Sequence, residues 1–320
     1  MMADTKKITL TPLSPVKLDK TNMRLLAALD VNGRLPLSQV AKKIGVSREN
    51  THYRFKQLQT DGVISSFELF VNNFVLGYKC YCLLLNLENL IDATREEMVA
   101  ELKSNKNIDV KTYILSIWDL ELTIWVKDDS EFYSFYDAFI KKHNNFIVDK
   151  RLFVVTRVHA FSHAYLHDMM HTVIVGPSKC VVIDEIDEKL LNILERDPRV
   201  ELVAIAARLK IAATTVAYRI RKLIRSKVIL GCMPRLDLNR IGYTQYRIEI
   251  LLNNPAQRSD VVSFLSAHAH ILRIYELIGS MDLAFEGDFS SAIQVDDFLQ
   301  QLKNKVPMIR NFDVRTIVKQ

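Results

Sequence analysis

The chain has 320 residues, of which 49% are hydrophobic and 25% charged, as is usual for a globular protein of two or more domains. No apolar run approaches the roughly 20 residues that span a bilayer, and the first fifteen residues lack the apolar core of a secretory signal. We therefore expect a cytoplasmic protein with no membrane partner.

The net charge of +6 is concentrated in two windows. Residues 16–67 carry nine Lys or Arg against four Asp or Glu, and residues 181–232 carry ten against seven. The rest of the chain is slightly acidic. Basicity confined to two short segments is expected of modules that contact a polyanion.

The two basic windows are copies of one unit. With an offset of 165 and no gap, identical residues recur from the first window to the second. The first members of these pairs are Leu25, Leu26, Leu29, Arg34, Leu37, Ala41, Tyr53, Arg54, Leu58, Val63 and Ile64. The register extends to Gly77-Tyr78 over Gly242-Tyr243, so the chain is a tandem repeat.

Three helical patterns open the first copy. The first follows Asp19 and ends at Asn32-Gly33, the second spans Ser38–Ile44, and the third runs from the N-cap Ser47 to about Asp61. A short helix, a tight turn and a longer helix form the helix-turn-helix layout. The strand-like residues that follow favour a winged version.

An alternation of strands and helices follows in each copy. In the first, we expect strands at 78–87, 110–117, 120–126 and 152–158, and helices at 94–104 and 130–144. In the second, we expect strands at 243–252, 271–278, 283–287 and 312–318, and helices at 258–268 and 290–304. This β-α-β-β-α-β order predicts a ferredoxin-like fold with one bare apolar sheet face that needs a partner.

The expected fold class is therefore α+β, with two winged helix-turn-helix domains alternating with two ferredoxin-like domains. The predicted divisions are an N-terminal tail (1–15), a winged helix-turn-helix domain (16–75), a ferredoxin-like domain (76–172), a linker (173–180), a second winged helix-turn-helix domain (181–240) and a second ferredoxin-like domain (241–320).

The second helix-turn-helix departs from the first. Ala212 stands where Ser47 caps the recognition helix, which should weaken the start of that helix by roughly 1 kcal/mol. Lys227 replaces Gly62 at a position that suits a left-handed backbone. The repeat is therefore unequal.

Several motifs make the chain resemble the Lrp/AsnC (feast/famine) family of transcription regulators. They are Leu18-Asp19, Asn32-Gly33-Arg34, the stretch from Val40 to Ser47, Tyr53-Arg54, Asp61-Gly62-Val63-Ile64, Leu76-Gly77-Tyr78 and, in the second copy, Gly279-Ser280-Met281-Asp282. The resemblance implies a double-stranded DNA partner, self-association through the ferredoxin-like domains, and an amino-acid-like effector bound at Gly279 and Asp282. That family ordinarily has one unit per chain, and the first copy has Trp118 in the corresponding turn, which disfavours an effector site there.

The recognition helix of the first copy has its core spacing at Thr51, Phe55 and Leu58. Its other face is expected to meet DNA, with Arg and Asn reading base edges in the major groove and Lys contacting phosphates. The predicted residues are Arg48, Asn50, His52, Tyr53 and Lys56, with Lys42 and Lys43 on the preceding helix. The alternative is a merely solvated helix face.

In the second copy, the predicted DNA-facing residues are Thr214, Thr215, Tyr218, Arg221 and Lys222. Their side chains offer few hydrogen bonds to base edges, whereas a dense basic run suits phosphates. We expect the first copy to discriminate sequence and the second to supply mainly phosphate affinity. If the ferredoxin-like domains pair within one chain, the preferred site is an imperfect palindrome with unequal half-sites, and pairing between chains gives four modules per dimer.

Other constellations suggest no cofactor, catalytic residue or metal. Cys80, Cys82, Cys180 and Cys232 fit neither a zinc spacing nor a disulfide framework, and the first two would share a strand face as reduced, partly buried residues. His159, His163, His167 and His171 recur every fourth residue, which on a helix could bind a metal ion but is more typical of a connecting helix.

An enzyme on the same two-domain plan is an alternative, because some proteins with this plan resemble sirohaem decarboxylases, which act as pairs of unlike units that a fusion could mimic. Those are expected to carry His-Asn-Tyr on the second strand of the α+β domain. Here that strand contains Lys111-Thr112-Tyr113-Ile114 in one copy and Arg273-Ile274-Tyr275-Glu276 in the other, without the histidine. A third class is a non-specific architectural DNA-binding protein.

Overall fold

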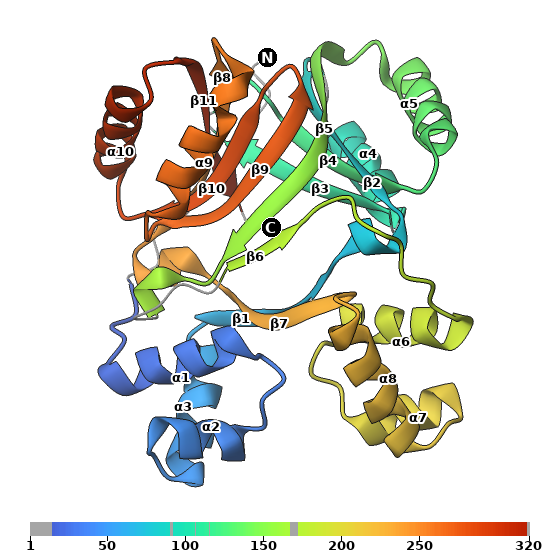
Figure 1. Ribbon diagram of the computed structural model, residues 1–320, viewed down its shortest axis with the longest axis vertical. Helices are drawn as coiled ribbons and strands as arrows, with labels where there is room; N and C mark the ends of the chain where they lie inside the picture. Colours follow the sequence, from blue (N-terminus) through green and yellow to red (C-terminus); the bar gives the residue numbers. More distant parts are fainter. Residues whose placement is uncertain (1–14, 90–91, 106, 115, 167–171, 319–320) are drawn as a thin grey trace.

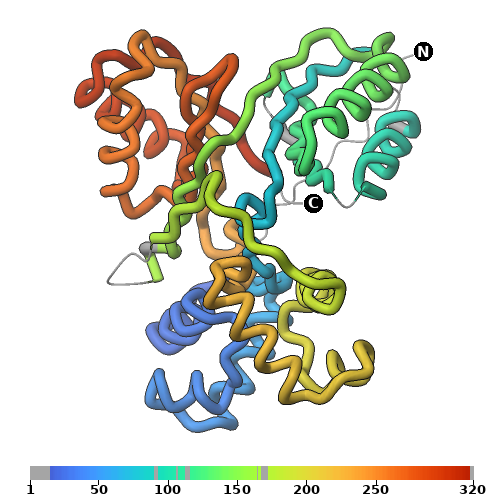
Figure 2. The backbone as a smooth tube through the Cα atoms, turned by 45° about the vertical axis from the view of Figure 1, so that its right-hand side comes forward, coloured from blue at the N-terminus to red at the C-terminus, as the bar shows by residue number. Residues whose placement is uncertain are grey.

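The computed structural model describes residues 15–318, apart from 90–91, 106, 115 and 167–171. Each repeat places a three-helix unit before an α+β unit (Figure 1). The two three-helix units lie together at one end of the molecule and the two α+β units at the other, so like parts of the repeats are neighbours (Figure 2). The expected fold class is confirmed.

The first three-helix unit follows the predicted pattern closely. Its elements are α1 (Lys20–Val31), α2 (Leu37–Ile44), α3 (Arg48–Thr60) and β1 (Ile64–Val71), with the short 3-10 helix η1 (Asn73–Leu76) after them. Asp19 caps α1 by accepting a hydrogen bond from Asn22 N, and Ser47 caps α3 by accepting one from Asn50 N. Gly45 ends α2 in the left-handed conformation.

The second three-helix unit has the same layout with weaker local signals. Its elements are α6 (Glu185–Arg196), α7 (Leu202–Leu209), α8 (Ala213–Arg225) and β7 (Ile229–Leu236), followed by η3 (Leu238–Ile241). As predicted, Ala212 gives α8 no side-chain cap. Lys227 has a φ of 57°, against 72° at Gly62, and Lys210 has a φ of 54°, against 69° at Gly45. Two lysines therefore hold backbone conformations that favour glycine.

The strand that follows each helix-turn-helix pairs with the equivalent strand of the other repeat. β1 and β7 form an antiparallel two-stranded sheet in which Leu69 is opposite Cys232. The predicted strand after the third helix is thus present, but its partner is 165 residues away. This sheet joins the two helix-turn-helix units side by side (Figure 1).

Two equivalent arginines reinforce this pairing. Arg34 donates to the carbonyl oxygens of Pro198 and Val200, and Arg199 donates to the carbonyl of Gly33. The contacts are reciprocal because the two arginines occupy the same position in the repeat, as at a two-fold interface. The Asn32-Gly33-Arg34 motif therefore forms hydrogen bonds that join the two repeats.

The two α+β units have the ferredoxin-like topology. The first consists of β2 (Lys79–Leu87), α4 (Asp92–Ser104), β3 (Ile108–Ile114), β4 (Leu120–Val126), α5 (Asp129–His143) and β5 (Ile147–Phe161). The second consists of β8 (Thr244–Leu252), η4 (Pro255–Gln257), α9 (Arg258–Ser266), β9 (Ile271–Gly279), β10 (Leu283–Phe289), α10 (Ala292–Lys305) and β11 (Ile309–Val318). The strand orders are β5-β2-β4-β3 and β11-β8-β10-β9.

The two sheets join at both edges into a closed barrel. β3 pairs with β11, and β5 pairs with β9, so each of these eight strands has a partner on both sides. The pairing of the α+β units, which the sequence left open, occurs here within one chain. Among the described residues, closure leaves none of these eight strands as a free edge that another chain could extend.

The apolar residues fall into layers that follow from strand alternation. Leu83 packs with Phe132 beneath the helices of the first unit, and Phe285 packs with Phe298 in the second. The helices lie outside the barrel (Figure 1). Cys80 and Cys82 share one face of β2, as their spacing predicted. That face is the inner side of the barrel, and both residues are buried free thiols.

The segment between the repeats departs from expectation. The predicted linker begins in a strand, β6 (Thr172–Val175), which pairs with the end of β5. The histidine run was predicted to lie on a connecting helix, but its first residue, His159, lies within β5. The short helix η2 spans Ala164–Leu166. In the described part of the chain, no helix is long and apolar enough to cross a membrane.

The left-handed lysines give a direct test of the inequality between the repeats. Lys227→Gly should raise the free energy of unfolding by about 0.5–1 kcal/mol. Glycine removes the strain of a side chain at positive φ, and this gain exceeds the loss that glycine causes by making the unfolded chain more flexible. The converse change, Gly62→Lys, should lower it by a similar amount. Urea unfolding of both variants measures the effect, and equal stability of all three proteins would show that the position carries no strain.

Candidate nucleic-acid interface

The recognition helix of the first repeat presents one buried and one solvated face. Thr51, Phe55 and Leu58 are buried against the helix-turn-helix core, as their spacing predicted. The residues predicted to meet DNA, Arg48, Asn50, His52, Tyr53 and Lys56, are all exposed, and Tyr53 is 67% exposed. Such an exposed aromatic and basic face is available to a partner.

Lys42 and Lys43 are exposed in the last turn of α2, next to the tight turn that leads to α3. The recognition helices α3 and α8 lie at the end of the molecule away from the barrel (Figure 1). The structure thus brings the predicted DNA-facing residues of the first repeat onto one end of the fold.

Arg54 has a positional role that the sequence reasoning missed. It donates to Asp19 at 2.7 Å, to Asn22 at 2.9 Å and to Asn50 Oδ1 at 2.7 Å. Arg54 thereby fixes α3 against the start of α1 and holds the Asn50 amide in one orientation. The available signal was its identity with Arg219 in the repeat.

Arg219 makes the equivalent contact in the second repeat, where a second carboxylate takes part. Its Nη1 lies 2.7 Å from both Asp184 Oδ2 and Asp187 Oδ1, and Asp187 is completely buried. The hydrogen bond from Arg219 lowers the pKa of Asp184. Both recognition helices are therefore attached to the first helix of their unit by an arginine–carboxylate pair.

The exposed face of α8 differs in chemistry from that of α3. Thr214, Tyr218 and Arg221 are exposed, and Thr215 is half-buried. Lys222 is exposed too, but its Nζ lies 3.2 Å from Asp187 Oδ2, so part of its charge is directed toward its own domain. Arg221 is thus the better candidate of the two for a phosphate contact.

The predicted effector residues have structural partners. Asp282 Oδ2 accepts a hydrogen bond from Leu252 N at 2.8 Å, and in the first repeat Asp119 Oδ2 accepts one from Leu87 N at 2.8 Å. At Gly279, whose φ is 136°, a Cβ atom would lie 2.8 Å from the carbonyl oxygen of Leu152. The glycine therefore permits the close approach of β9 to β5 at the barrel seam.

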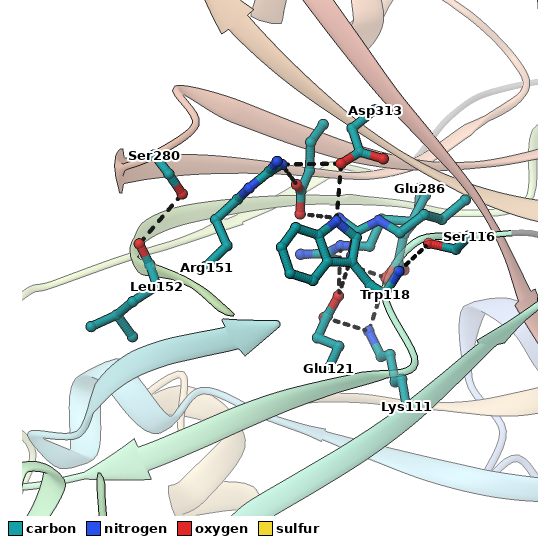
Figure 3. Close-up of polar contacts among 12 residues, drawn as sticks. Lys111, Ser116, Trp118, Glu121, Arg151, Leu152, Ser280, Glu286 and Asp313 are labelled. Atoms are coloured by element: carbon teal, nitrogen blue, oxygen red, sulfur yellow. Dashed lines mark hydrogen bonds and ion pairs between the residues drawn. The ribbon is translucent and has the colours of Figure 1, made fainter. Parts of the chain in front are cut away.

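Trp118 occupies the barrel interior at the corresponding turn of the first repeat. It is 1% exposed, and its indole Nε1 donates to Asp313 Oδ2 at 3.1 Å (Figure 3). The Arg151 guanidinium lies 4.7 Å from the ring centroid. The indole fills the space near this turn.

The histidine run does not form a helical metal site in the described residues. His159 Nε2 lies 2.9 Å from Glu276, whereas His163 Nδ1 lies 2.9 Å from the buried Asp30 on α1. His167 and His171 lie outside the described residues. Among those that are described, no group of three His, Cys, Asp or Glu is arranged to hold a metal ion.

A family model for the AsnC-type helix-turn-helix domain matches the chain twice, at residues 18–59 and 183–224. The chain therefore contains two AsnC-type helix-turn-helix domains, one in each repeat. The HTH-type transcriptional regulator FL11 of Pyrococcus horikoshii is 27% identical over 139 residues, which cover 43% of this chain and 91% of that protein. Its namesake in Pyrococcus furiosus is 26% identical over 121 residues, 38% of this chain and 80% of that protein.

Among solved structures, one protein is similar to this chain over both repeats. The sirohaem decarboxylase NirDL has a TM-score of 0.64 and covers 93% of this chain and 91% of its own, at 12% sequence identity. At that identity the match shows a shared fold. The tandem arrangement of two helix-turn-helix and two α+β units is thus found in another solved protein.

The arginine–carboxylate pair of the second repeat can be tested against a neighbouring arginine. Arg219→Ala should lower the free energy of unfolding by about 2 kcal/mol, because the buried Asp187 loses a charged hydrogen-bond donor. Arg221→Ala, an exposed residue on the same helix, should change it by less than about 0.5 kcal/mol. Chemical denaturation distinguishes the two, and an equal effect of both changes would show that the pair does not hold α8 in place.

Proposed function

We propose that this protein is a sequence-specific regulator of transcription that binds double-stranded DNA with α3 and α8 in the major groove. The observation that supports this most strongly is the double match to the AsnC-type helix-turn-helix domain, with all the predicted DNA-facing residues of the recognition helices exposed except the half-buried Thr215. The relatives FL11 are named transcriptional regulators. The carboxylate partners of Arg54 and Arg219 fix these helices before DNA is bound.

We propose further that the two recognition helices have unequal roles. Arg48 and Asn50 have the donors and acceptors that read guanine and adenine edges. The face of α8 offers Thr214 and Tyr218, with the exposed cations Arg221 and Arg225 toward its end. Since one chain carries both helices side by side, its preferred site is an imperfect palindrome in which one half is read and the other is held mainly by phosphates.

The division of labour is tested on duplexes enriched from a randomised pool with the full chain. Arg48→Ala or Asn50→Ala should cost about 1–3 kcal/mol on the selected duplex and relax its base preference. Arg221→Ala with Arg225→Ala should weaken selected and competitor DNA alike and make binding less dependent on salt. Arg221 and Arg225 are chosen for this test because Lys222 already forms an ion pair with Asp187.

Fluorescence anisotropy at several salt concentrations measures the affinity of each variant for the selected duplex and for competitor DNA. The proposal of unequal roles is contradicted if both sets of variants lose base discrimination equally. A complex that has no preference over competitor DNA before any substitution would instead favour a non-specific architectural protein.

An enzyme like the sirohaem decarboxylases is the second candidate, because NirDL shares the fold over both repeats. The histidine of the His-Asn-Tyr motif is absent from β3 and β9, where Lys111 and Arg273 stand. A haem-like absorption band in the purified protein would support this candidate over the regulator.

Modulation by an amino-acid-like effector is a prediction of the family resemblance. Gly279 and Asp282 already have structural roles at the barrel seam and at the end of β8. A rise in the midpoint of thermal unfolding with one common amino acid, abolished by Asp282→Asn, would support the site. No rise with any of them would count against it.

A further inference from the structure

The interior of the barrel contains a network of charged residues that connects the two repeats. Lys111 Nζ on β3 lies 3.0 Å from Glu286 Oε1 on β10, and Arg247 Nε on β8 lies 3.2 Å from Glu121 Oε2 on β4. Apart from Lys111, these side chains are almost completely buried. Each pair joins a residue of the first repeat to one of the second (Figure 3).

Arg151 extends the network to the seam. Its Nη1 lies 3.0 Å from Asp313 Oδ2 on β11 and 3.7 Å from Glu249 Oε2 on β8. Asp313 in turn accepts the hydrogen bond of Trp118 (Figure 3). Ionic contacts therefore accompany the apolar contacts between the inner faces of the two units, which include Trp118, Phe153 and Leu277. A buried charge is costly unless it is paired.

The strand registers show which positions of the two repeats are equivalent. β2 and β8 match with the offset of 165, so Leu84 corresponds to Glu249. Leu84 is opposite Arg151 in the β2–β5 pair, and Glu249 is opposite Asp313 in the β8–β11 pair. Arg151 and Asp313 therefore occupy the same position in the two repeats and touch each other across the local two-fold axis.

The other charged positions are also different in the two repeats. Cys82 corresponds to Arg247, and the residues opposite them are Thr123 and Glu286. Likewise Glu121, opposite Leu84, corresponds to Ala284, opposite Glu249. A charge at one of these inner positions is thus matched by a neutral residue at the same position of the other repeat.

This pattern favours a barrel formed by two unlike units over a barrel formed by two copies of the same unit. In a barrel built from two first-repeat units, Arg151 would meet a second Arg151, and in one built from two second-repeat units Asp313 would meet a second Asp313. Glu121 would meet a cysteine in place of Arg247, and Glu286 would lose Lys111. Like charges would be brought together, and Glu121 and Glu286 would each lose a cation that the other repeat supplies.

We infer that the inner face of each α+β unit is a selective interface, which accepts the unlike unit of the repeat and rejects a second copy of itself. The first unit, with Arg151, fits a partner that has a carboxylate at this position, and the second unit, with Asp313, fits a partner that has a cation there. Polar groups of this kind commonly fix partner choice at some cost in stability. Like-with-like barrels are therefore disfavoured, and within one chain each unit has the unlike unit beside it.

The pKa of Glu286 agrees with this arrangement. Burial alone would raise the pKa of this carboxyl, but Lys111, Arg273 and Arg247 outweigh the effect of burial and hold the pKa well below its usual range. The carboxylate is therefore charged at neutral pH, and Lys111 is the cation that the first repeat contributes to it, beside Arg247 and Arg273 of its own repeat.

Charge exchange in the full chain tests the interface. Arg151→Asp places a carboxylate against Asp313, and Asp313→Arg places two guanidinium groups together. Each should lower the folding equilibrium constant roughly tenfold to a hundredfold, whereas the double variant should regain most of the loss. The matched control exchanges Lys142 and Glu101, an exposed pair 2.5 Å apart within the first repeat, and should change it by about twofold at most.

A mixing experiment tests partner choice itself. A tagged Arg151→Asp chain and an untagged Asp313→Arg chain, refolded together, offer complementary faces only to each other. Pull-down of the tagged chain should recover its counterpart well above the background of either variant refolded with itself. A double variant no more stable than the single ones, or recovery at background level in the mixture, would overturn the inference.

Discussion

The closure of eight strands into one barrel is the constraint on which the rest of the molecule depends. Each α+β unit has a sheet with one face covered by helices, and that sheet needs a second layer over its bare face. The seams between β5 and β9 and between β3 and β11 provide it within one chain. Because the two α+β units close on each other, the two helix-turn-helix units attached to them are held side by side.

The helix-turn-helix units inherit this pairing. β1 and β7 lie antiparallel beneath the barrel, and Arg34 and Arg199 bond reciprocally across them. Both recognition helices therefore reach the same end of the fold, in the arrangement that a two-fold dimer gives to a palindromic site. Fusion allows the two halves to differ, and the sequence differs where a homodimer could not: in the caps of the recognition helices, in the left-handed lysines and in the charges of the barrel interior.

The sequence predicted the elements well because their signals are local. The Ser47 cap, the alternation in the strands and the offset of 165 placed most helices and strands within a few residues. The pairing of β1 with β7 was not predictable, since it joins segments far apart and follows from barrel closure. The histidine spacing was misleading because His159 lies in a strand. Arg54 and Asp313 were missed because their partners lie on other elements.

The central claim is that the two repeats pair within a single chain, and a designed cross-link tests it most directly. Leu69 is opposite the native Cys232, and directly opposed residues of antiparallel strands are close enough for a disulfide. In Leu69→Cys, with the exposed Cys180 changed to Ser, mild oxidation should give a cross-linked species with the mass of one chain. A product with the mass of two chains, joined by the same two residues, would contradict the account.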